Sequence, residues 1–385
     1  MTRKKILWLC SWYPSGTDPF NGDFIQRYAR AVSLYHDVHV IFVTAGEQDN
    51  RKAIREELFR SPGLTEHIIY FHKNTSATGR LRAHWQWNRL FRKAINTYLQ
   101  NQGMPDLVHV QVPMRAGLLA LWLKKKYGIP FVITEHWGIY NPVEKLNYQT
   151  RSFFFKKITR KIFREAAAFH TVSSFLGEGV SKWVVDRDYE VIPNVTDTSL
   201  FTYRPGKRTR FRFLHVSNMV QLKNVPGILR AFAGLLRTCP DCELVLLGNT
   251  DDTMPERAKE LGLTAGNCRF GGLVTYEEVA GTMQEADALV IFSDIENSPC
   301  VIGEALCCGL PVIATRTGGI PELIRAENGL LVEPGNETEL QEAMRNMMDK
   351  AFSFNREQIA REAISAFSYP SAGRKLASWY LRYCR

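Results

Sequence analysis

Two glutamates on either side of a short turn form the part of this sequence best suited to chemistry. The segment 294–315 reads DIENSPCVIGEALCCGLPVIAT and follows an apolar strand predicted over residues 288–292. Glu296 is therefore expected on a loop at the carboxyl end of that strand, and Glu304 in the helix that follows. A carboxylate on each side of an anion site suits a ligand in which a ribose and a sugar flank a diphosphate.

The helix is predicted to begin between these two carboxylates. Ser298 is a typical N-cap, Pro299 fits the first helical position, and Gly309 ends the helix. The first amides of a helix have no partner inside it, so those of residues 298–301 are suited to hold a phosphate. A capped helix with two solvated glutamates fits the same spacing, and the spacing alone leaves both interpretations open.

The rest of the chain shows the same alternation of predicted strands and helices in both halves. Short runs rich in Val, Ile and Leu alternate with longer amphipathic segments, which is typical of βαβ units and parallel sheets. Strands are predicted over residues 6–10, 38–44, 67–71, 107–111, 130–134, 168–172 and 190–193, and then over 212–216, 243–248, 268–271, 288–292, 311–315 and 329–332. The weakest stretch, Asn194–Lys207, is the predicted hinge. The predicted fold class is α/β, with two Rossmann-like domains facing each other across a cleft at the carboxyl ends of both sheets.

Length and composition exclude several classes of protein. The 385 residues allow two domains, and 45% hydrophobic with 23% charged residues is ordinary for a globular protein. No run approaches the ~18 apolar residues of a membrane-spanning helix, and the N-terminal run 6–10 is too short for a signal peptide. The eight cysteines lie mostly in apolar runs, which predicts reduced, buried thiols in a cytoplasmic protein.

Seven motifs in register resemble those of the retaining glycosyltransferases of family 4, the group 1 glycosyltransferases, which have the GT-B fold. Glu296 and Glu304, with seven residues between them, match the E-x7-E motif of that family. The segments that agree in order and spacing are 191–195, 216–224, 244–248, 271–274, 286–293, 305–315 and 318–332. The resemblance therefore covers essentially the whole chain.

The resemblance implies a nucleotide-sugar donor, UDP- or GDP-linked, bound mainly by the C-terminal domain. Glu304 would hydrogen-bond the ribose hydroxyls, and Glu296 would lie against the transferred sugar. Lys223 would pair with the diphosphate, whose negative charge grows as it leaves. The other donor-binding residues that the resemblance implies are Gly22, Asn218, Leu273, Asn297, Ser298, Pro299, Cys300 and Val301.

Two of these positions depart from the pattern of the family. The family usually has Arg where this chain has Asn218, so Lys223 would carry more of the phosphate stabilisation. Gly22 lies at a predicted strand-to-helix turn where the family often has two adjacent glycines, and it would let the backbone approach a phosphate. A plain turn glycine is the alternative. The backbone around Leu273 would meet the nucleotide base.

In the N-terminal half, His136 follows the predicted strand 130–134 and matches the active-site histidine of the family. Its expected role is contact with the transferred sugar instead of proton relay, and a polar loop histidine is the alternative. Glu135 is a second carboxylate beside it with no assigned role, and His109 is expected to be structural.

The resemblance implies front-face displacement, in which the leaving phosphate deprotonates the acceptor hydroxyl and the protein supplies positioning and charge. The family offers no dependable carboxylate nucleophile for a double displacement. A cationic site needs no metal, and the only Asp-x-Asp sequence, at residues 186–188, precedes the hinge strand. We therefore expect no metal and no cofactor.

The positive charge of the chain is concentrated in its first half. Residues 1–200 hold 28 Lys and Arg against 17 Asp and Glu, whereas residues 201–385 hold 21 against 22. A basic half favours an anionic partner. Segments 80–93 and 151–164 mix aromatic with basic residues, a pattern typical of helices on anionic membranes and of nucleic-acid binding. Of these we expect a membrane surface and no nucleic acid.

A purely structural interpretation of segment 151–164 is a helix that buries Phe154, Ile158 and Ile162 against the sheet while Lys and Arg face water. Under either interpretation the acceptor is expected on this basic half.

The sequence thus predicts a retaining, hexosyltransferase-type glycosyltransferase. It would move a sugar from a nucleotide-sugar to a glycan or lipid-linked glycan in cell-surface polysaccharide biosynthesis, in the cytoplasm and peripheral on the inner face of the membrane. Residues 1–200 with a C-terminal helix, 365–385, would bind the acceptor, and residues 201–364 the donor. The alternatives are a related epimerase, which would lack the paired glutamates, a phosphorylase, whose cofactor lysine cannot be placed, and a non-enzymatic binding protein.

Overall fold

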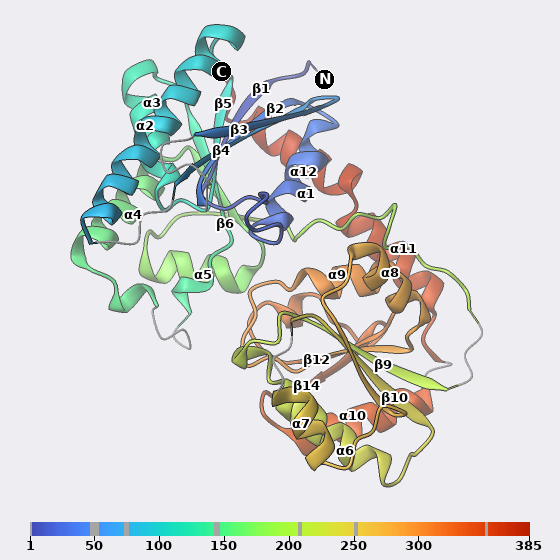
Figure 1. Ribbon diagram of the computed structural model, residues 1–385. Helices are drawn as coiled ribbons and strands as arrows, with labels where there is room; N and C mark the ends of the chain where they lie inside the picture. Colours follow the sequence, from blue (N-terminus) through green and yellow to red (C-terminus); the bar gives the residue numbers. More distant parts are fainter. Residues whose placement is uncertain are drawn as a thin grey trace. The chain divides into compact units, whose positions relative to one another are not determined.

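The computed structural model describes residues 2–46, 54–72, 77–141, 147–206, 210–249, 253–350 and 353–385, which form two compact units (Figure 1). The first unit comprises Met1–Pro193 and Tyr369–Arg385, and the second comprises Asn194–Ser368. Each unit contains one sheet with helices packed on it.

The unit boundaries lie at residues 193 and 368, whereas the sequence analysis placed them at 200 and 364. Hydrogen bonds explain the difference. The Tyr28 hydroxyl lies 2.6 Å from the carbonyl oxygen of Ile192 and 2.7 Å from that of Pro193, which ties the chain up to Pro193 to the first unit. The Thr196 amide donates to the Phe367 carbonyl at 2.9 Å, inside the second unit. The predicted hinge begins at this boundary, but its last residue, Lys207, lies outside the described residues.

The first sheet has eight strands in the order β3-β4-β2-β1-β5-β6-β7-β8. All neighbours pair in parallel except β3 and β4, which form an antiparallel hairpin at one edge. The bounds are β1 (Lys5–Cys10), β2 (Asp37–Gly46), β3 (Arg55–Ser61), β4 (Leu64–His72), β5 (Leu107–Gln111), β6 (Phe131–Glu135), β7 (Ala168–Thr171) and β8 (Glu190–Val191).

Helices cover this sheet, and the last of them comes from the far end of the chain. They are α1 (Asp23–Ser33), α2 (Ala77–Gln102), α3 (Ala116–Tyr127), α4 (Phe153–Glu165), α5 (Ser174–Trp183) and α12 (Tyr369–Leu381). Helix α12 packs on α1 so closely that a Cβ at Gly373 would overlap the carbonyl of Ala31. Trp379 and Tyr380 of α12 are fully buried, so the C-terminal segment completes the core of the first unit.

The second sheet is wholly parallel, in the order β11-β10-β9-β12-β13-β14. Its strands are β9 (Phe211–Val216), β10 (Cys242–Leu247), β11 (Cys268–Gly272), β12 (Ala288–Ile291), β13 (Val312–Thr315) and β14 (Gly329–Val332). Its helices are α6 (Val225–Leu236), α7 (Thr253–Glu260), α8 (Tyr276–Glu285), α9 (Cys300–Cys307), α10 (Glu337–Lys350) and α11 (Arg356–Phe367). Apolar clusters on both faces of the sheet explain why its strands read as unbroken apolar runs.

Helix α4 differs from the sequence expectation at one position. Ile162 is buried and Ile158 is half-buried, but Phe154, expected in the core, is 73% exposed. The face that packs on the core instead carries Thr159, Ile162 and Phe163, which are buried, and Phe155, which is half-buried. Phe154 lies off this face, as does Phe153, and both aromatic rings face solvent at the start of the helix.

Candidate active site

Glu296 lies on the loop between β12 and α9, where it pairs with a lysine from another loop. Its Oε1 accepts a hydrogen bond from the Ser293 hydroxyl at 2.8 Å and forms an ion pair with Lys223 Nζ. The side chains of Glu296 and Lys223 are 12% and 23% exposed, so the pair is sheltered but reachable from solvent. One carboxylate and one ammonium group therefore meet at the carboxyl edge of the second sheet.

Lys223 reaches this position because its turn is bonded to the Glu296 loop. The turn is a short 3₁₀ helix, Gln221–Lys223, that follows β9, and the Asp294 amide donates to the Leu222 carbonyl at 2.8 Å. Asn224 then takes a left-handed conformation (φ 47°) and caps α6 by accepting from the Gly227 amide at 3.2 Å. The two segments that carry the charges are thus joined through their backbones.

A glycine turn after β13 holds the Glu296 loop from its other side. Gly318 has a φ of 54°, and a Cβ there would overlap the Glu296 carbonyl. The Gly319 amide donates to that carbonyl at 3.0 Å, and the Thr317 hydroxyl donates to the Asp294 carbonyl at 3.0 Å. In the sequence these glycines are recognisable only as part of a motif, and this role was not predicted. The signal that could have revealed it is two adjacent glycines that begin three residues after the end of a buried strand.

The start of α9 is one residue later than predicted. Pro299 is the N-cap residue, not the first helical residue, because its ψ of 121° is extended, and no side chain caps the helix. Ser298, expected as the N-cap, lies one residue further out. Its carbonyl accepts a 2.7 Å hydrogen bond from the Asn194 side chain. The helix ends as predicted, at Gly309 with a φ of 67°.

Glu304 lies in α9 and is only 4% exposed, in contrast to the other predicted donor-binding residues of the second unit. Asn218 is exposed two residues after β9, and Leu273 is 64% exposed directly after β11. The remaining members of this group in the second unit are half-buried: Asn297, Ser298, Pro299, Cys300 and Val301. Asn218, Leu273 and the loop 297–299 thus follow the carboxyl ends of β9, β11 and β12, which lie within four consecutive strands of the sheet.

In the first unit, His136 follows β6 and is held among aromatic rings. It is 8% exposed, with its ring centroid 4.7 Å from that of Phe24 and 5.7 Å from that of Tyr28. Its Nε2 lies 3.3 Å from the Gln111 side-chain oxygen. Burial, and to a smaller extent the neighbouring His170, holds the pKa of His136 well below its usual value. A neutral imidazole near pH 7 fits contact with a substrate better than proton relay.

Glu135, to which the sequence analysis gave no role, fixes the loop that carries His136. One carboxylate oxygen accepts from the amides of His136 and Trp137, both at 2.9 Å, and the other accepts from the Tyr140 hydroxyl at 2.6 Å. Burial raises the pKa of Glu135 to about 7, although these three hydrogen bonds oppose the rise. The local signal for this role is the position of Glu135 as the last residue of a buried strand.

His109 belongs to a buried network instead of an exposed site. One ring nitrogen contacts the Tyr380 hydroxyl and the other lies 2.6 Å from the Thr134 hydroxyl. That hydroxyl lies 2.5 Å from a ring nitrogen of His170. Because burial lowers the pKa of His109 well below its ordinary value, the network holds a neutral ring.

Gly22 is the N-cap residue of α1 and has a left-handed conformation with a φ of 76°. A Cβ there would meet the backbone of Trp12 and Tyr13 at 2.9 Å. The close approach that requires glycine is therefore between two backbone segments of the first unit. A contact between Gly22 and the donor stays a prediction.

The two other sequence features considered for chemistry take ordinary structural positions. Arg187, between the two exposed carboxylates of the Asp-x-Asp sequence, donates to three backbone carbonyls at 2.8–3.0 Å. Within the described residues, no group of three or more His, Cys, Asp or Glu side chains has an arrangement that could hold a metal ion. All eight cysteines are free thiols, five of them buried.

These features define a class of enzyme. Two Rossmann-like domains give the chain the architecture of the GT-B glycosyltransferases. One is built on a wholly parallel sheet and the other on a sheet that is parallel except for its β3–β4 hairpin. Two family models then match consecutive parts of the chain: "Glycosyltransferase Family 4" over residues 24–200 and "Glycosyl transferases group 1" over residues 204–365. The chain belongs to the group 1 glycosyltransferases of family 4.

Individual proteins agree with this assignment. The chain is 28% identical to an MMP α-(1→4)-mannosyltransferase of Mycolicibacterium hassiacum, over 75% of this chain and 73% of that protein. It is 25% identical to TuaC of Bacillus subtilis, a glycosyltransferase named for teichuronic acid biosynthesis, over 88% of both chains. Among solved structures, HepE of Anabaena in complex with UDP superposes with a TM-score of 0.73 at 19% identity, covering 98% of this chain and 100% of that one.

Proposed function

We propose that this protein is a retaining glycosyltransferase that moves a sugar from a nucleoside diphosphate, UDP or GDP, to a glycan or lipid-linked glycan in cell-surface polysaccharide biosynthesis. The observation that carries the proposal is the Lys223–Glu296 pair beside the start of α9. The name of TuaC, which refers to teichuronic acid biosynthesis, supports the surface-glycan setting, and the name of the mannosyltransferase supports transfer of a sugar.

Lys223 and Glu296 would each contact a different part of the donor, the diphosphate and the sugar respectively. Lys223 supplies a positive charge to the diphosphate, whose negative charge increases as the glycosidic bond breaks, so its attraction is strongest in the transition state. Glu296, held by Ser293 and by the Gly318–Gly319 turn, accepts hydrogen bonds from the sugar hydroxyls. The leaving phosphate takes the proton of the acceptor hydroxyl on the same face, which retains the configuration of the sugar.

The general test of this proposal is a panel of UDP- and GDP-sugars examined by saturation-transfer NMR and by slow donor hydrolysis. Binding and hydrolysis of one sugar nucleotide would identify the base and the sugar together. A panel in which no sugar nucleotide binds, with the protein folded by circular dichroism, would contradict the proposal.

Glu304→Ala is expected to weaken binding of the nucleoside diphosphate by roughly 1.5–3 kcal/mol, since a charged hydrogen bond to the ribose is lost. Calorimetry with the free diphosphate measures this loss directly. Glu327→Ala, which removes an exposed carboxylate of the same unit, is the matched control and should not change the affinity. Unchanged affinity in a folded Glu304→Ala protein would remove Glu304 from the donor site.

Transfer is expected to continue in excess EDTA, because Lys223 and the helix amides supply the charge that a metal would otherwise provide. The measurement is the release of nucleoside diphosphate by dialysed enzyme, with and without chelator. Loss of transfer in EDTA, followed by recovery on adding Mg²⁺ or Mn²⁺, would show that transfer requires a divalent metal ion and would contradict this prediction.

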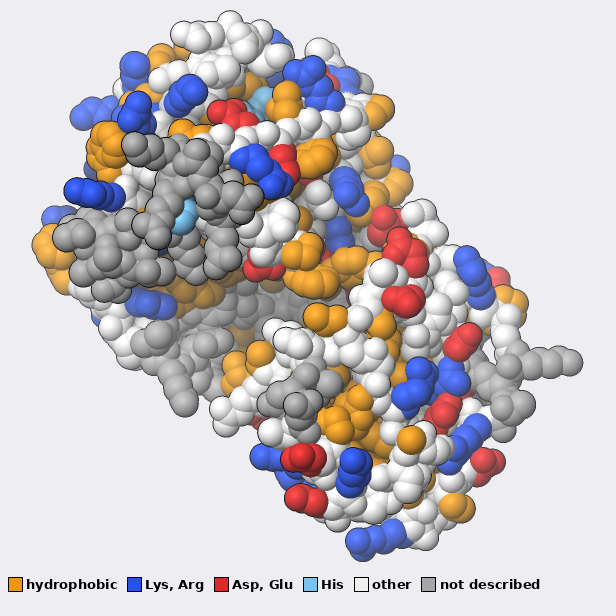
Figure 2. Space-filling model, in the orientation of Figure 1, with side chains coloured by type: hydrophobic (Ala, Val, Ile, Leu, Met, Phe, Trp, Pro, Cys, Tyr) orange, Lys and Arg blue, Asp and Glu red, His pale blue; other side chains and the backbone are white. Residues whose placement is uncertain are grey.

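We further propose that α4 brings the first unit to an anionic membrane. Phe153 and Phe154 are 70% and 73% exposed in its first turn, and Lys157, Arg160 and Lys161 are exposed on the same helix. Lys and Arg side chains are also spread over the face of this unit that Figure 2 shows. No helix among the described residues is long and apolar enough to span a bilayer. Within the second aromatic segment, 80–93, Trp85 is 63% exposed, whereas Trp87 is buried.

The protein is therefore expected to sediment with vesicles that contain anionic lipid at low salt and to be released as the salt concentration rises. Each basic residue near the surface contributes ~1 kcal/mol, and screening acts over ~8 Å at physiological salt. Replacing both Phe153 and Phe154 by serine, or Lys156, Lys157, Arg160 and Lys161 by glutamate, should reduce sedimentation. The control is Phe59→Ser, on β3, because Phe59 is 52% exposed in the same unit. Equal binding by all variants would contradict the role of α4.

A further inference from the structure

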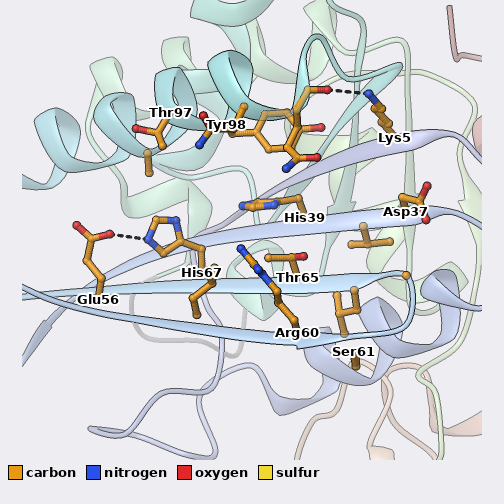
Figure 3. A pocket seen from close by; sticks show the side chains of 17 residues that line it. Lys5, Asp37, His39, Glu56, Arg60, Ser61, Thr65, His67, Thr97 and Tyr98 are labelled. Atoms are coloured by element: carbon orange, nitrogen blue, oxygen red, sulfur yellow. Dashed lines mark hydrogen bonds and ion pairs between the residues drawn. The ribbon is translucent and has the colours of Figure 1, made fainter.

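A pocket of about 620 Å³ lies in the first unit, between the β3–β4 hairpin, β2 and the C-terminal part of α2 (Figure 3). Lys5, Asp37 and Leu64, which line it, are the first residues of β1, β2 and β4. His136, in contrast, follows the carboxyl end of β6. Because these four strands run in parallel, the pocket lies at the opposite edge of the sheet from His136.

The pocket exists because one face of the sheet changes from apolar to polar beneath α2. In the strand register, Arg60, Thr65 and His39 lie opposite one another on β3, β4 and β2, and Figure 3 shows them in a row. Further along the same face, the positions are Ile69 and Val43, which pack into the core under α2. A sheet face covered by a helix is normally apolar throughout, so a polar row at this place favours a bound ligand.

Among the described residues, the carboxylates that line the pocket have partners and Arg60 does not. Glu56 pairs with His67 at 2.8 Å, and Asp37 with Arg3 at 2.8 Å. In the part of the chain that the structure describes, Arg60 has no hydrogen-bond or ion-pair partner, and the ring nitrogens of His39 accept or donate no hydrogen bond. The pocket therefore presents a guanidinium group without a partner. Burial, with smaller contributions from the charges of His67 and Arg60, lowers the pKa of His39 to about 4, so the adjacent imidazole is neutral near pH 7.

We propose that this pocket binds a small phosphate ester of the size of a sugar phosphate. The guanidinium fork of Arg60 matches two phosphate oxygens, and Lys5, whose Nζ now donates to the Gln102 carbonyl at 2.7 Å, adds a second cation. Thr65 and Thr97 offer hydroxyl groups to the rest of the ligand, and the volume suits a small molecule. The ring of Tyr98, 4.8 Å from that of His39, forms an apolar wall. The site is separate from the proposed donor site and does not depend on it.

The test is calorimetry of the full-length protein with three probes: a hexose 6-phosphate, inorganic phosphate and citrate. We expect the hexose phosphate to bind, inorganic phosphate to bind more weakly, and citrate to bind less than either. Arg60→Gln should weaken binding at least about tenfold, the effect of losing one charged contact. Tightest binding of citrate would overturn the phosphate assignment, and no binding of any probe would overturn the site.

Matched variants separate this pocket from other anion sites. Arg55 is on the same strand but pairs with Glu57 and lies over the ring of Tyr70, so Arg55→Gln should leave binding unchanged. Lys223→Ala, which disables the proposed diphosphate site, should also leave it unchanged. Arg60→Gln should not alter transfer in the absence of phosphate esters. An equal loss in Arg55→Gln, loss in Lys223→Ala, or a slower basal transfer in Arg60→Gln would each contradict the assignment.

Discussion

Replacing Lys223 by alanine is expected to lower the rate of sugar transfer on the order of 10²-fold or more, the usual cost of removing a group that stabilises charge in the transition state. Two effects act together. The leaving diphosphate would lose its proposed cation, and Asn218, at the position where the family resemblance implies an arginine, brings no charge to replace it. Glu296 also loses its ion-pair partner, which leaves a largely buried carboxylate without compensation. The rate is measured in single turnovers at saturating donor.

Two variants show whether charge at this position is responsible. Lys223→Arg keeps the charge and should recover part of the rate, while Lys259→Ala, which removes an exposed lysine of the same unit, should match the unchanged enzyme. If Lys223→Ala retained most of the rate, the diphosphate would have to be stabilised by other groups, and the proposed division of roles would be wrong.

Gly318→Ala is expected to destabilise the protein by more than about 2 kcal/mol and to lower transfer about 10²-fold. A left-handed backbone costs a residue with a Cβ roughly 1–2 kcal/mol, and overlap with a packed neighbour adds roughly 1–3 kcal/mol. The neighbour is the carbonyl of Glu296, so relief of the overlap moves the loop that carries the carboxylate. A shift of ~1 Å in such a group is enough for the loss in rate.

Gly335→Ala provides the control for Gly318→Ala. Gly335 has a similar φ, 75°, but a Cβ there would meet nothing within 4 Å. It should show only the cost of the backbone conformation and keep its activity. Thermal unfolding and transfer rates for both variants make the comparison. Equal stability and activity of the two variants would mean that Gly318 does not hold the Glu296 loop.

The sequence predicted the two sheets well for a physical reason. Strands buried on both faces must be apolar at every position, so runs such as 288–292 are distinct in the sequence. The exception is β3, Arg55–Ser61, which reads REELFRS and pairs only on one side, at an exposed edge. A strand of this kind has no apolar pattern of its own, and its pairing with β4 is a property of the folded sheet.

The sequence analysis named candidate site residues but none of the contacts between them. Glu296 and Lys223 were each identified, yet their pairing depends on a backbone bond between Asp294 and Leu222 that no local pattern contains. The same limit applies to Glu135, whose partners follow it by one to five residues but bond to it only in one loop conformation. Phe154 was instead expected in the core and is exposed, because a helical period alone does not fix which of two adjacent helix faces is buried.

Because α12 packs in the first unit, it affects the order in which the two units can complete their folding. Trp379 and Tyr380, which fill the core of the first sheet, leave the ribosome only after every residue of the second unit. The second unit is continuous from residue 194 to residue 368, so its synthesis is complete before Trp379 and Tyr380 are added. Domains tend to fold as units as they emerge. The half of the chain that is translated first is therefore the half whose folding is completed last.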